Sequence, residues 1–451
     1  MRTTSALPPT NGSLARWERV GLWLLLLAFM IQGFNVVNRS VYLERRFTDL
    51  GIYLRAAWAA RTGQDIYSVT DNGCHYVYPP ALAILLTPLA EPPPAQLDQP
   101  HVPFLASVIL WYAFSVVCGL GAIHLLATAV ERVHHDGIDP RRWWALRFIP
   151  LLVCLPPFFG TLVHGQVNLL MLLLVCGSIA ACLRGRAFIA GLCLSGAICL
   201  KICPAFLLLY PLWRRDFRFL IGTAAGSAVL LVLIPSLYWG PARTWEQHRR
   251  FAEVVLLPGL GTGDDRTVAK ELTEVTATDS QSLAAIFHKT LYLDRDSRPH
   301  HASAGVRLLA LLAAALLGGA TLLAGRRGGA SPRHELLFFG CLIVVMLALC
   351  PVTHLPYFVL LVPLVMALVA CHLPAAGTAQ WLTPGLSAWN GLAALFGVNI
   401  VSRILPHLPD CFLFRDLGVS MWAALLLWLA GMLTLLQARR PFSLARRANA
   451  T

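Results

Sequence analysis

The sequence predicts an all-α protein that crosses the membrane repeatedly, in about 12 membrane segments. Of its 451 residues, 57% are hydrophobic and 13% are charged, whereas a soluble domain is roughly 45–50% apolar and about 25% charged. Apolar runs recur along the chain, and a helix of about 20 apolar residues spans a bilayer. The composition therefore excludes an ordinary soluble protein.

The basic residues follow a membrane pattern rather than a nucleic-acid-binding one. The net charge is +13, but many arginines lie in short clusters between apolar runs, as in the cytoplasmic loops of membrane proteins. Nucleic acid is therefore not an expected partner. The clusters are Arg16/Arg19, Arg132/Arg141/Arg142, Arg184/Arg186, Arg214/Arg215/Arg218, Arg326/Arg327/Arg333 and Arg439/Arg440/Arg446/Arg447.

Ten apolar runs are predicted to be membrane helices because of their length and composition. The first is interpreted as a retained span, since no small-residue cleavage site follows it. The runs are 20–37, 104–130, 145–162, 166–183, 217–237, 303–324, 335–351, 356–373, 386–402 and 417–438.

The segment 187–213 is predicted to be two short helices rather than one span. Basic clusters stand at both of its ends, and Lys201 and Pro204 interrupt its middle. Proline removes a backbone donor and disfavours helix at the residue before it. Two helices that meet near Lys201 keep both basic clusters on the cytoplasmic side, and they bring the number of membrane segments to about 12.

With the N-terminus inside, this topology returns every basic cluster to the cytoplasm. The tails 1–19 and 441–451 are then cytoplasmic, and 20–440 is a single transmembrane domain. The outward segments carry most of the unusual polar residues, so these residues are expected to share one site. The outward segments are 38–103, 156–165, the apex near Lys201, 238–302, 351–356 and 403–416.

The long first outward loop, 38–103, is predicted to carry interfacial helices. Thr48 or Asp49 can cap a helix that Gly63 ends. A second interfacial or re-entrant helix is expected over 81–90. One face of the first helix is apolar and is expected to lie on the membrane boundary, with Arg55 facing lipid headgroups. That face comprises Leu50, Leu54, Ala57 and Trp58.

Most of the 12 cysteines lie in or beside apolar runs and are expected to pack as small buried side chains. Cys74 and Cys411 lie in predicted outward loops, where they can pair if that side is oxidising. The sequence leaves this pairing open. No Cys/His spacing resembles a metal site, and neither a metal nor a cofactor is expected.

Several short motifs, in this order, resemble glycosyltransferase family 87. These are GT-C enzymes that depend on polyprenol-phosphate sugars and include mycobacterial mannosyltransferases acting on phosphatidylinositol mannosides. The resemblance covers about residues 20–440. The motifs are Asp49-x3-Tyr53-x3-Ala57, Gly63-x3-Tyr67, Tyr78-Pro79-Pro80, Pro88-Leu89-Ala90, Gly165-Gln166-Val167-Asn168, Lys201-x2-Pro204, Gln281-Ser282-Leu283 and Pro351-x2-His354-x2-Tyr357.

The chain departs from the family pattern at a few positions. Ser280 stands where the family has Asn, and His288-Lys289 stands where an Arg is expected. The segment 259–278 is an expanded, charged insertion, and a single His354 replaces paired histidines. These departures bear on the sugar and the acceptor more than on the type of reaction.

The resemblance implies an inverting transfer of a sugar, mannose by family default, from a polyprenyl phosphate to a hydroxyl of a lipid or glycan acceptor. Asp49 is the expected general base, and a positioned base contributes roughly 10²–10⁴-fold. Lys201 and His354 are expected to bind the donor phosphate. The residues expected to bind sugar or acceptor are Tyr53, Tyr78, His164, Gln166, Asn168 and Gln281.

The expected location is the inner (plasma) membrane, with several spans and contacts to membrane lipids. Purely structural roles for the candidate site residues remain open. Asp49 can be only a helix cap, Lys201 can snorkel to the surface, and Gln166 and Asn168 can simply hydrogen-bond across helices. Two other functions are a transporter or flippase for a lipid-linked or polar solute, and a scaffold that binds a partner through loop 238–302.

Overall fold

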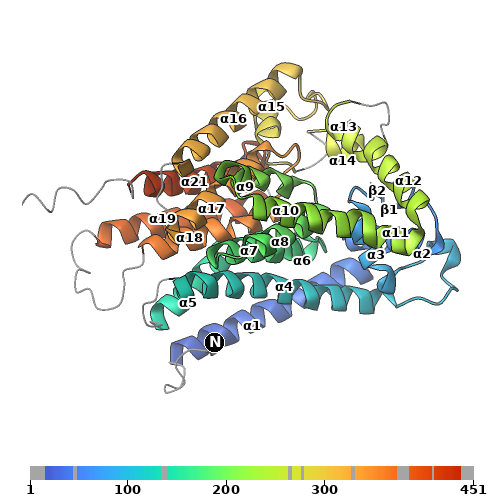
Figure 1. Ribbon diagram of the computed structural model, residues 1–451, viewed down its shortest axis with the longest axis horizontal. Coiled ribbons are helices and arrows are strands. Elements are labelled where there is room, and N and C mark those ends of the chain that lie inside the picture. Colours follow the sequence, from blue (N-terminus) through green and yellow to red (C-terminus); the bar gives the residue numbers. More distant parts are fainter. Residues whose placement is uncertain are drawn as a thin grey trace, which may run out of the picture.

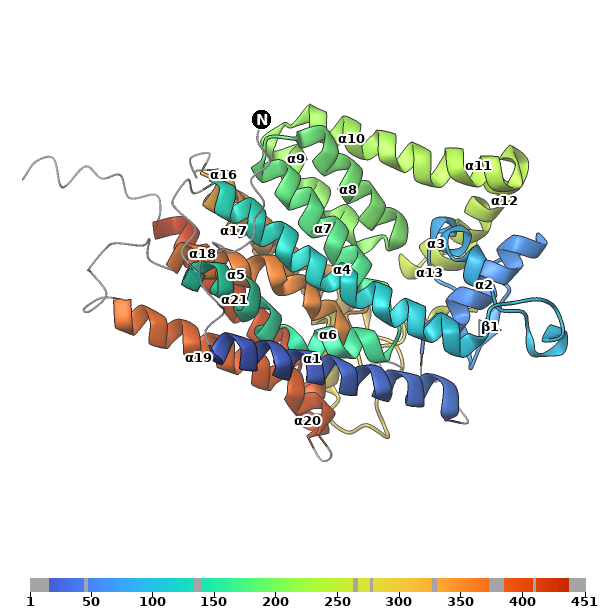
Figure 2. The ribbon, with the colours of Figure 1, turned by 90° about the horizontal axis from the view of Figure 1, so that it is seen from below.

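The computed structural model describes residues 16–43, 48–133, 140–262, 267–275, 279–326, 331–372, 385–408 and 411–437. The predicted tails therefore lie outside the described residues, apart from 16–19, and the insertion 259–278 is described only in part. Most helices lie side by side in one bundle, which Figure 1 shows along its length. Figure 2 shows that α2, α3, α11, α12 and β1 gather at one end of it.

The bundle helices follow the predicted apolar runs. They are α1 (Arg16–Val37), α4 (Phe104–Val133), α5 (Pro140–Val153), α6 (Leu155–Val163), α7 (Asn168–Leu183), α8 (Ala187–Leu200), α9 (Leu209–Arg214), α10 (Phe217–Ser227), α11 (Ile234–Trp239), α16 (Ala304–Arg326), α17 (Pro332–Leu349), α18 (Val362–His372), α19 (Gly385–Ile404) and α21 (Val419–Gln437). The main helices outside this set are α2 (Leu50–Thr62), α3 (Pro80–Leu85), α12 (Pro241–Phe251), α13 (Leu257–Gly259), α14 (Ala269–Leu272), α15 (Leu283–Leu291) and α20 (Phe412–Asp416).

By length and composition, seven helices within the described residues can cross a bilayer. The pair α5 and α6 adds one more if it counts as a single span, bent by 58° at its break. Two shorter apolar helices, α7 and α8, accompany them. These helices confirm an all-α protein with several membrane spans, while the count of about 12 segments stays a prediction.

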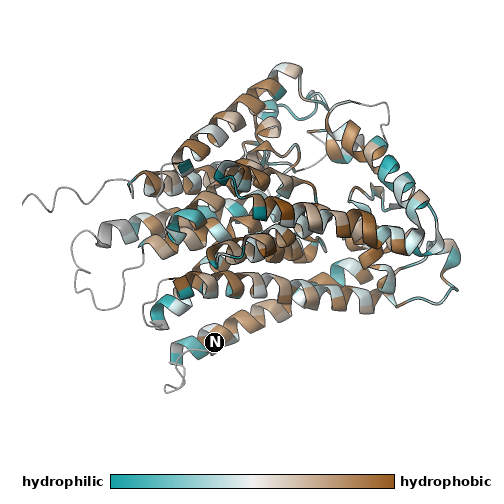
Figure 3. Cartoon of the chain, in the orientation of Figure 1, coloured by the Kyte–Doolittle hydropathy of each residue, from teal (hydrophilic) through white to brown (hydrophobic). Residues whose placement is uncertain are grey.

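The core of the bundle is built on α17, α18 and the 3-10 turn η7 (Leu355–Leu361) between them. Nearly every residue of these elements is buried. Peripheral helices such as α1 and α16 instead expose large apolar side chains, including Phe34 at 77% and Leu316 at 75%. Figure 3 shows hydrophobic residues along the bundle helices. This arrangement is expected when the solvent around the bundle is lipid.

The predicted break at Lys201 is confirmed. Helix α8 ends at Leu200, Lys201 is extended, and the chain returns through the 3-10 turn η4 (Cys203–Leu208) and α9. Helices α8 and α10 then run parallel and in close contact. Gly222 lies against Phe188, and, further along both helices, Gly226 lies against Ser195. A Cβ on Gly222 would lie 2.2 Å from the Phe188 carbonyl oxygen, so this close crossing needs glycine.

Helix α2 does not lie on the membrane boundary as predicted. It ends as expected at Gly63, which has φ +75° and donates its N–H to the Ala59 carbonyl oxygen. However, every residue from Leu50 to Ala60 is buried, on the polar as well as the apolar side. The prediction that the apolar face meets the membrane was wrong, because other parts of the protein cover both sides of the helix. The second predicted helix appears as α3, where Leu85 is 56% exposed.

Arg55 does not face lipid headgroups. It is buried, and its guanidinium lies 3.9 Å from the Asp71 carboxylate and 3.8 Å from the Glu91 carboxylate. Asp71 belongs to a hairpin of β1 (Thr70–Asp71) and β2 (Cys74–His75). The turn residues Asn72 and Gly73 both have positive φ, as a two-residue hairpin turn requires. Cys74 and Cys411 are both free thiols in the structure.

Candidate active site

Four of the predicted site residues form one continuous chain of polar contacts. Gln166 donates from Nε2 to Oδ2 of Asp49 at 2.9 Å, and Asn168 donates from Nδ2 to Oε1 of Gln166 at 2.8 Å. Nζ of Lys201 donates to Oδ1 of Asn168 at 3.4 Å. A carboxylate and an ammonium are thus joined through two amides. The amides are buried, and Asp49 and Lys201 are half-buried.

Asp49 stands at the N-cap position of α2, but its side chain does not cap the helix. Its backbone is already helical, with φ −72° and ψ −14°, and its side chain accepts no capping hydrogen bond. The Thr48 hydroxyl takes that role, accepting from the Leu50 N–H at 3.2 Å. The alternative that Asp49 serves only as a helix cap is therefore wrong, and its carboxylate instead accepts the hydrogen bond from Gln166.

The turn between α6 and α7 fixes Asp49 against Gln166. The Asp49 N–H donates to the carbonyl oxygen of His164 at 2.8 Å. Gly165 follows with φ +61°, and its carbonyl oxygen accepts from Nε1 of Trp111 at 2.8 Å. A Cβ on Gly165 would lie 2.4 Å from the Thr48 hydroxyl oxygen, so only glycine allows this approach.

We expect Gly165→Ala to disturb the site more than backbone strain alone explains. A non-glycine residue at positive φ costs of order 1–3 kcal/mol, and here the new methyl group also displaces Thr48. Gly185→Ala is the matched control, because Gly185 has φ +70° but nothing within 4 Å of the added Cβ. Thermal melting and transfer activity measure the two effects. Equal loss of activity in both variants would contradict a close fit at Gly165.

Burial raises the pKa of the Asp49 carboxyl above its ordinary value, while His164, Gln166 and Lys201 act in the opposite direction. A raised pKa makes the carboxylate a stronger base once it is ionised. His164 is therefore near Asp49, as predicted, although its backbone carbonyl makes the direct contact.

Tyrosines surround Lys201. Its Nζ lies 3.7 Å from the ring centroid of Tyr357 and 5.5 Å from that of Tyr78. The Tyr53 hydroxyl donates to the Tyr78 hydroxyl at 2.9 Å, and the two rings meet edge to face. Cation–π contacts of this kind hold an ammonium without neutralising it. These contacts fix Lys201 within the bundle, so the snorkelling interpretation does not describe it.

Gln281 does not join the chain of contacts around Asp49. It is buried and donates from Nε2 to the Arg415 carbonyl oxygen at 2.7 Å, while its own N–H donates to the carbonyl oxygen of Thr353 at 2.7 Å. The second of these bonds ties the loop before α15 to the residue that precedes His354. The His354 ring packs edge to face against Tyr357, with ring centroids 5.7 Å apart. His354 therefore reaches the surroundings of Lys201 through Tyr357.

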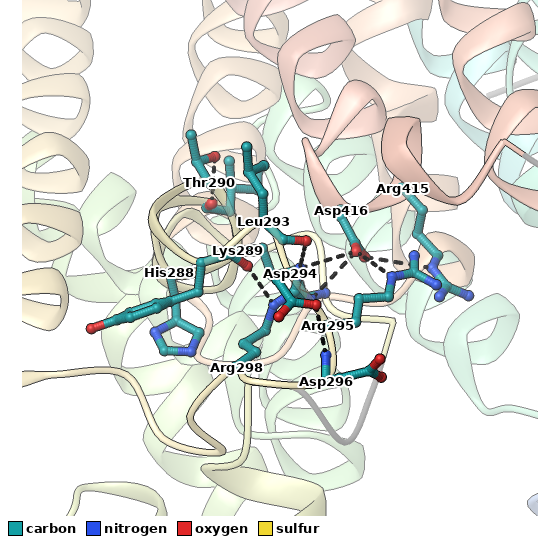
Figure 4. Close-up of polar contacts among 12 residues, drawn as sticks. His288, Lys289, Thr290, Leu293, Asp294, Arg295, Asp296, Arg298, Arg415 and Asp416 are labelled. Atoms are coloured by element: carbon teal, nitrogen blue, oxygen red, sulfur yellow. Dashed lines mark hydrogen bonds and ion pairs between the residues drawn. The ribbon is translucent and has the colours of Figure 1, made fainter.

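An ion-pair network that the sequence did not predict lies beside Gln281. Figure 4 shows this network in close-up. Asp416 accepts from Nε of Arg295 at 2.9 Å and from Arg298 at 3.3 Å. Lys289, one of the noted departures, is buried and donates to the Ser280 carbonyl oxygen at 3.1 Å. Burial lowers its pKa to about 8. The network anchors the loop around α15 to α20, and only the clustering of charges in 279–298 signals it in the sequence.

In the part of the chain that the structure describes, no group of three or more His, Cys, Asp or Glu residues could hold a metal ion. The expectation of a reaction without metal or cofactor stays a prediction. His75, another polar residue of the segment between α1 and α4, lies 2.9 Å from the Glu271 carboxylate rather than beside Asp49.

The fold and the site together define a membrane protein with several spans that holds a carboxylate and an ammonium on one polar chain. Residues 76–351, more than half of the 451, match the model of glycosyltransferase family 87. The chain belongs to this family, and the predicted resemblance is confirmed. Asp49 and His354 lie outside the matched residues.

Two curated relatives are mycobacterial. Each is a polyprenol-phosphate-mannose-dependent alpha-(1-2)-phosphatidylinositol mannoside mannosyltransferase. The Mycobacterium tuberculosis protein is 28% identical over 289 residues, 61% of this chain and 65% of the relative. The Mycolicibacterium smegmatis protein is 27% identical over 263 residues, 55% of this chain and 56% of the relative. The matched stretch thus covers less than two thirds of either relative.

Among solved structures, the chain matches that of ArnT from Cupriavidus metallidurans, bound to undecaprenyl phosphate. The TM-score is 0.42 at 15% sequence identity, and the alignment covers 94% of this chain and 78% of ArnT.

Proposed function

We propose that this chain is an inverting glycosyltransferase that moves a sugar from a polyprenyl-phosphate donor to a hydroxyl of a lipid or glycan acceptor. The names of the two mycobacterial relatives favour mannose and a lipid-linked acceptor. The observation that carries the proposal is the hydrogen-bonded chain that joins the Asp49 carboxylate to the Lys201 ammonium.

The reaction needs a base at one end of the sugar and a cation at the other. The acceptor oxygen bonds to the anomeric carbon as the bond from that carbon to the phosphate oxygen breaks. Asp49 takes the proton of the acceptor hydroxyl, and polyprenyl phosphate leaves with one more negative charge. Lys201 stabilises that charge, with His354 beside it, since a cation fixed in place does not have to reorganise during the reaction.

The amides between the two charges are the proposed ligands of sugar or acceptor hydroxyls. Gln166 and Asn168 each carry donors and an acceptor, as hydroxyl recognition requires. Tyr53, Tyr78 and His164 are proposed to complete this surface. Gln281 is proposed to act from the adjacent network, through its bond to Thr353.

The proposed location is the inner (plasma) membrane, with the site on the extracytoplasmic face. Lys201 stands at the far end of α8 from Arg184 and Arg186. The positive-inside rule favours the cytoplasm for those arginines and hence the opposite face for Lys201.

The test is transfer by the purified protein from polyprenyl-phosphate mannose to a phosphatidylinositol mannoside, followed as a function of pH. The base works only when it is ionised, and the pKa of Asp49 is raised above 3.8. We therefore expect kcat to be full above the raised pKa and to fall as the pH drops through it, at higher pH than for an ordinary aspartate. Movement of the donor across vesicles without transfer would instead support a transporter or flippase.

A further inference from the structure

A pocket lined by apolar and basic side chains lies far from Asp49, beside the turn that follows α9. It has a volume of about 590 Å³ and is lined by Leu212, Trp213, Arg215 and Arg326. Arg215 lies two residues before α10, which starts beside the start of α8, whereas Lys201 lies at the far end of α8. The pocket is therefore separated from the candidate active site by the length of α8.

The carboxylates near this pocket are engaged elsewhere. Glu335 accepts from Nη2 of Arg214 and from the Tyr210 hydroxyl, each at 2.6 Å. Asp216 caps α10 by accepting from the Phe219 N–H at 3.1 Å. Among the described residues, neither Arg215 nor Arg326 has a carboxylate partner. The pocket thus presents two guanidinium groups whose counter-ion the described chain does not supply.

Arg215 occupies a backbone position that normally favours glycine. Its φ is +54° and its ψ is 38°, in the left-handed region. The Asp216 N–H donates to the Pro211 carbonyl oxygen at 2.9 Å, as in a Schellman motif that ends a helix. Glycine would fill this position with less strain. Arg214, in the last turn of α9, already supplies a cation to the helix C-terminus, so Arg215 is not required for that purpose.

The walls of the pocket suit a lipid rather than a soluble anion. Leu212 is 55% exposed and Trp213 is 37% exposed, beside the two arginines. Tryptophan is typical of the membrane–water interface, and arginine binds phosphate through paired hydrogen bonds. A phospholipid offers a phosphate for the arginines and an apolar body for Leu212 and Trp213.

We propose that this pocket binds the phosphate of an anionic membrane phospholipid, held by Arg215 and Arg326. The proposal does not depend on the glycosyl transfer proposed above. Because arginine stays protonated at all physiological pH values, the binding is expected to vary with salt rather than with pH.

The experiment is native mass spectrometry of the delipidated full chain with phosphatidylglycerol, with phosphatidylcholine as the zwitterionic comparison. We expect phosphatidylglycerol to bind preferentially. Arg215→Gly and Arg326→Gln should each weaken its binding about tenfold or more, the loss of one charge-assisted contact. Arg218→Gln is the matched control, because Arg218 is exposed, lies in the same turn region and does not line the pocket.

Arg215→Gly also separates binding from folding, since it removes the strained backbone position together with the guanidinium. We expect its melting temperature to be kept or raised while lipid binding falls. If Arg215→Gly and Arg326→Gln both bound phosphatidylglycerol as well as Arg218→Gln does, the proposal would be overturned. Stabilisation by inorganic phosphate but not by phosphatidylglycerol would overturn it as well, because the site would then serve a soluble anion.

Discussion

Asp49→Asn is expected to lower kcat for sugar transfer by roughly 10²–10⁴-fold, the contribution of a positioned general base. Asparagine has nearly the same shape and its amide oxygen can still accept from Nε2 of Gln166, which lies 2.9 Å from the Asp49 carboxylate in the wild type. The fold should therefore be kept while the proton acceptor is lost. Steady-state transfer with donor and acceptor both saturating measures this effect on kcat.

The control for Asp49→Asn is Asp98→Asn, which removes an exposed carboxylate of the same segment between α1 and α4. Its rate should match the wild type, and both variants should melt at the wild-type temperature. If Asp49→Asn transferred the sugar as fast as Asp98→Asn does, Asp49 would not be the general base. This conclusion would hold whatever reaction the protein catalyses.

Lys201→Met is expected to raise KM for the polyprenyl-phosphate donor by about 10- to 100-fold, as the loss of a hydrogen bond to a charged group predicts. Methionine fills similar space between Tyr78 and Tyr357 without the charge. Lys201 also lowers the pKa of Asp49, so its removal should shift the acid limb of the pH profile to higher pH. KM for the acceptor should stay unchanged.

Lys201→Arg keeps the positive charge and should retain more donor affinity than Lys201→Met. The two variants together separate the effect of charge from that of packing. A donor KM that stays at the wild-type value in Lys201→Met would show that the ammonium does not bind the phosphate. An unmoved acid limb would show that it is not coupled to Asp49.

The membrane helices could be predicted because their signal is local. An apolar run of sufficient length specifies a helix on its own, and basic clusters at both ends of 187–213 required a return near Lys201. The set of site residues was accessible for a related reason, since the motifs place Asp49 and Lys201 in predicted outward segments and Gln166 and Asn168 at the start of the span that follows one. Which of these residues hydrogen-bonds to which depends on Gly165 and on tertiary packing, and neither effect can be read from the sequence.

The errors concern contacts between distant parts of the chain. The pattern of α2 correctly indicated an apolar face, but burial of the opposite face depends on partners such as Asp71 and Glu91 for Arg55. The network around Asp416 was missed for the same reason, because Arg295 and Asp416 are separated by 121 residues. Hydrophobic periodicity and composition indicate the secondary structure that a segment favours. They do not indicate which distant segment packs against it.

The enclosure of α2 has a consequence for how the protein tolerates membranes of different thickness. A surface-lying helix shifts in depth and tilt when acyl chains lengthen or shorten, and would carry its side chains with it. Helix α2, which starts immediately after Asp49, is buried within the protein and is therefore not in contact with the acyl chains. Changes in bilayer thickness should therefore be absorbed by outer helices such as α1 and α16, leaving the carboxylate in register with the helices that face it.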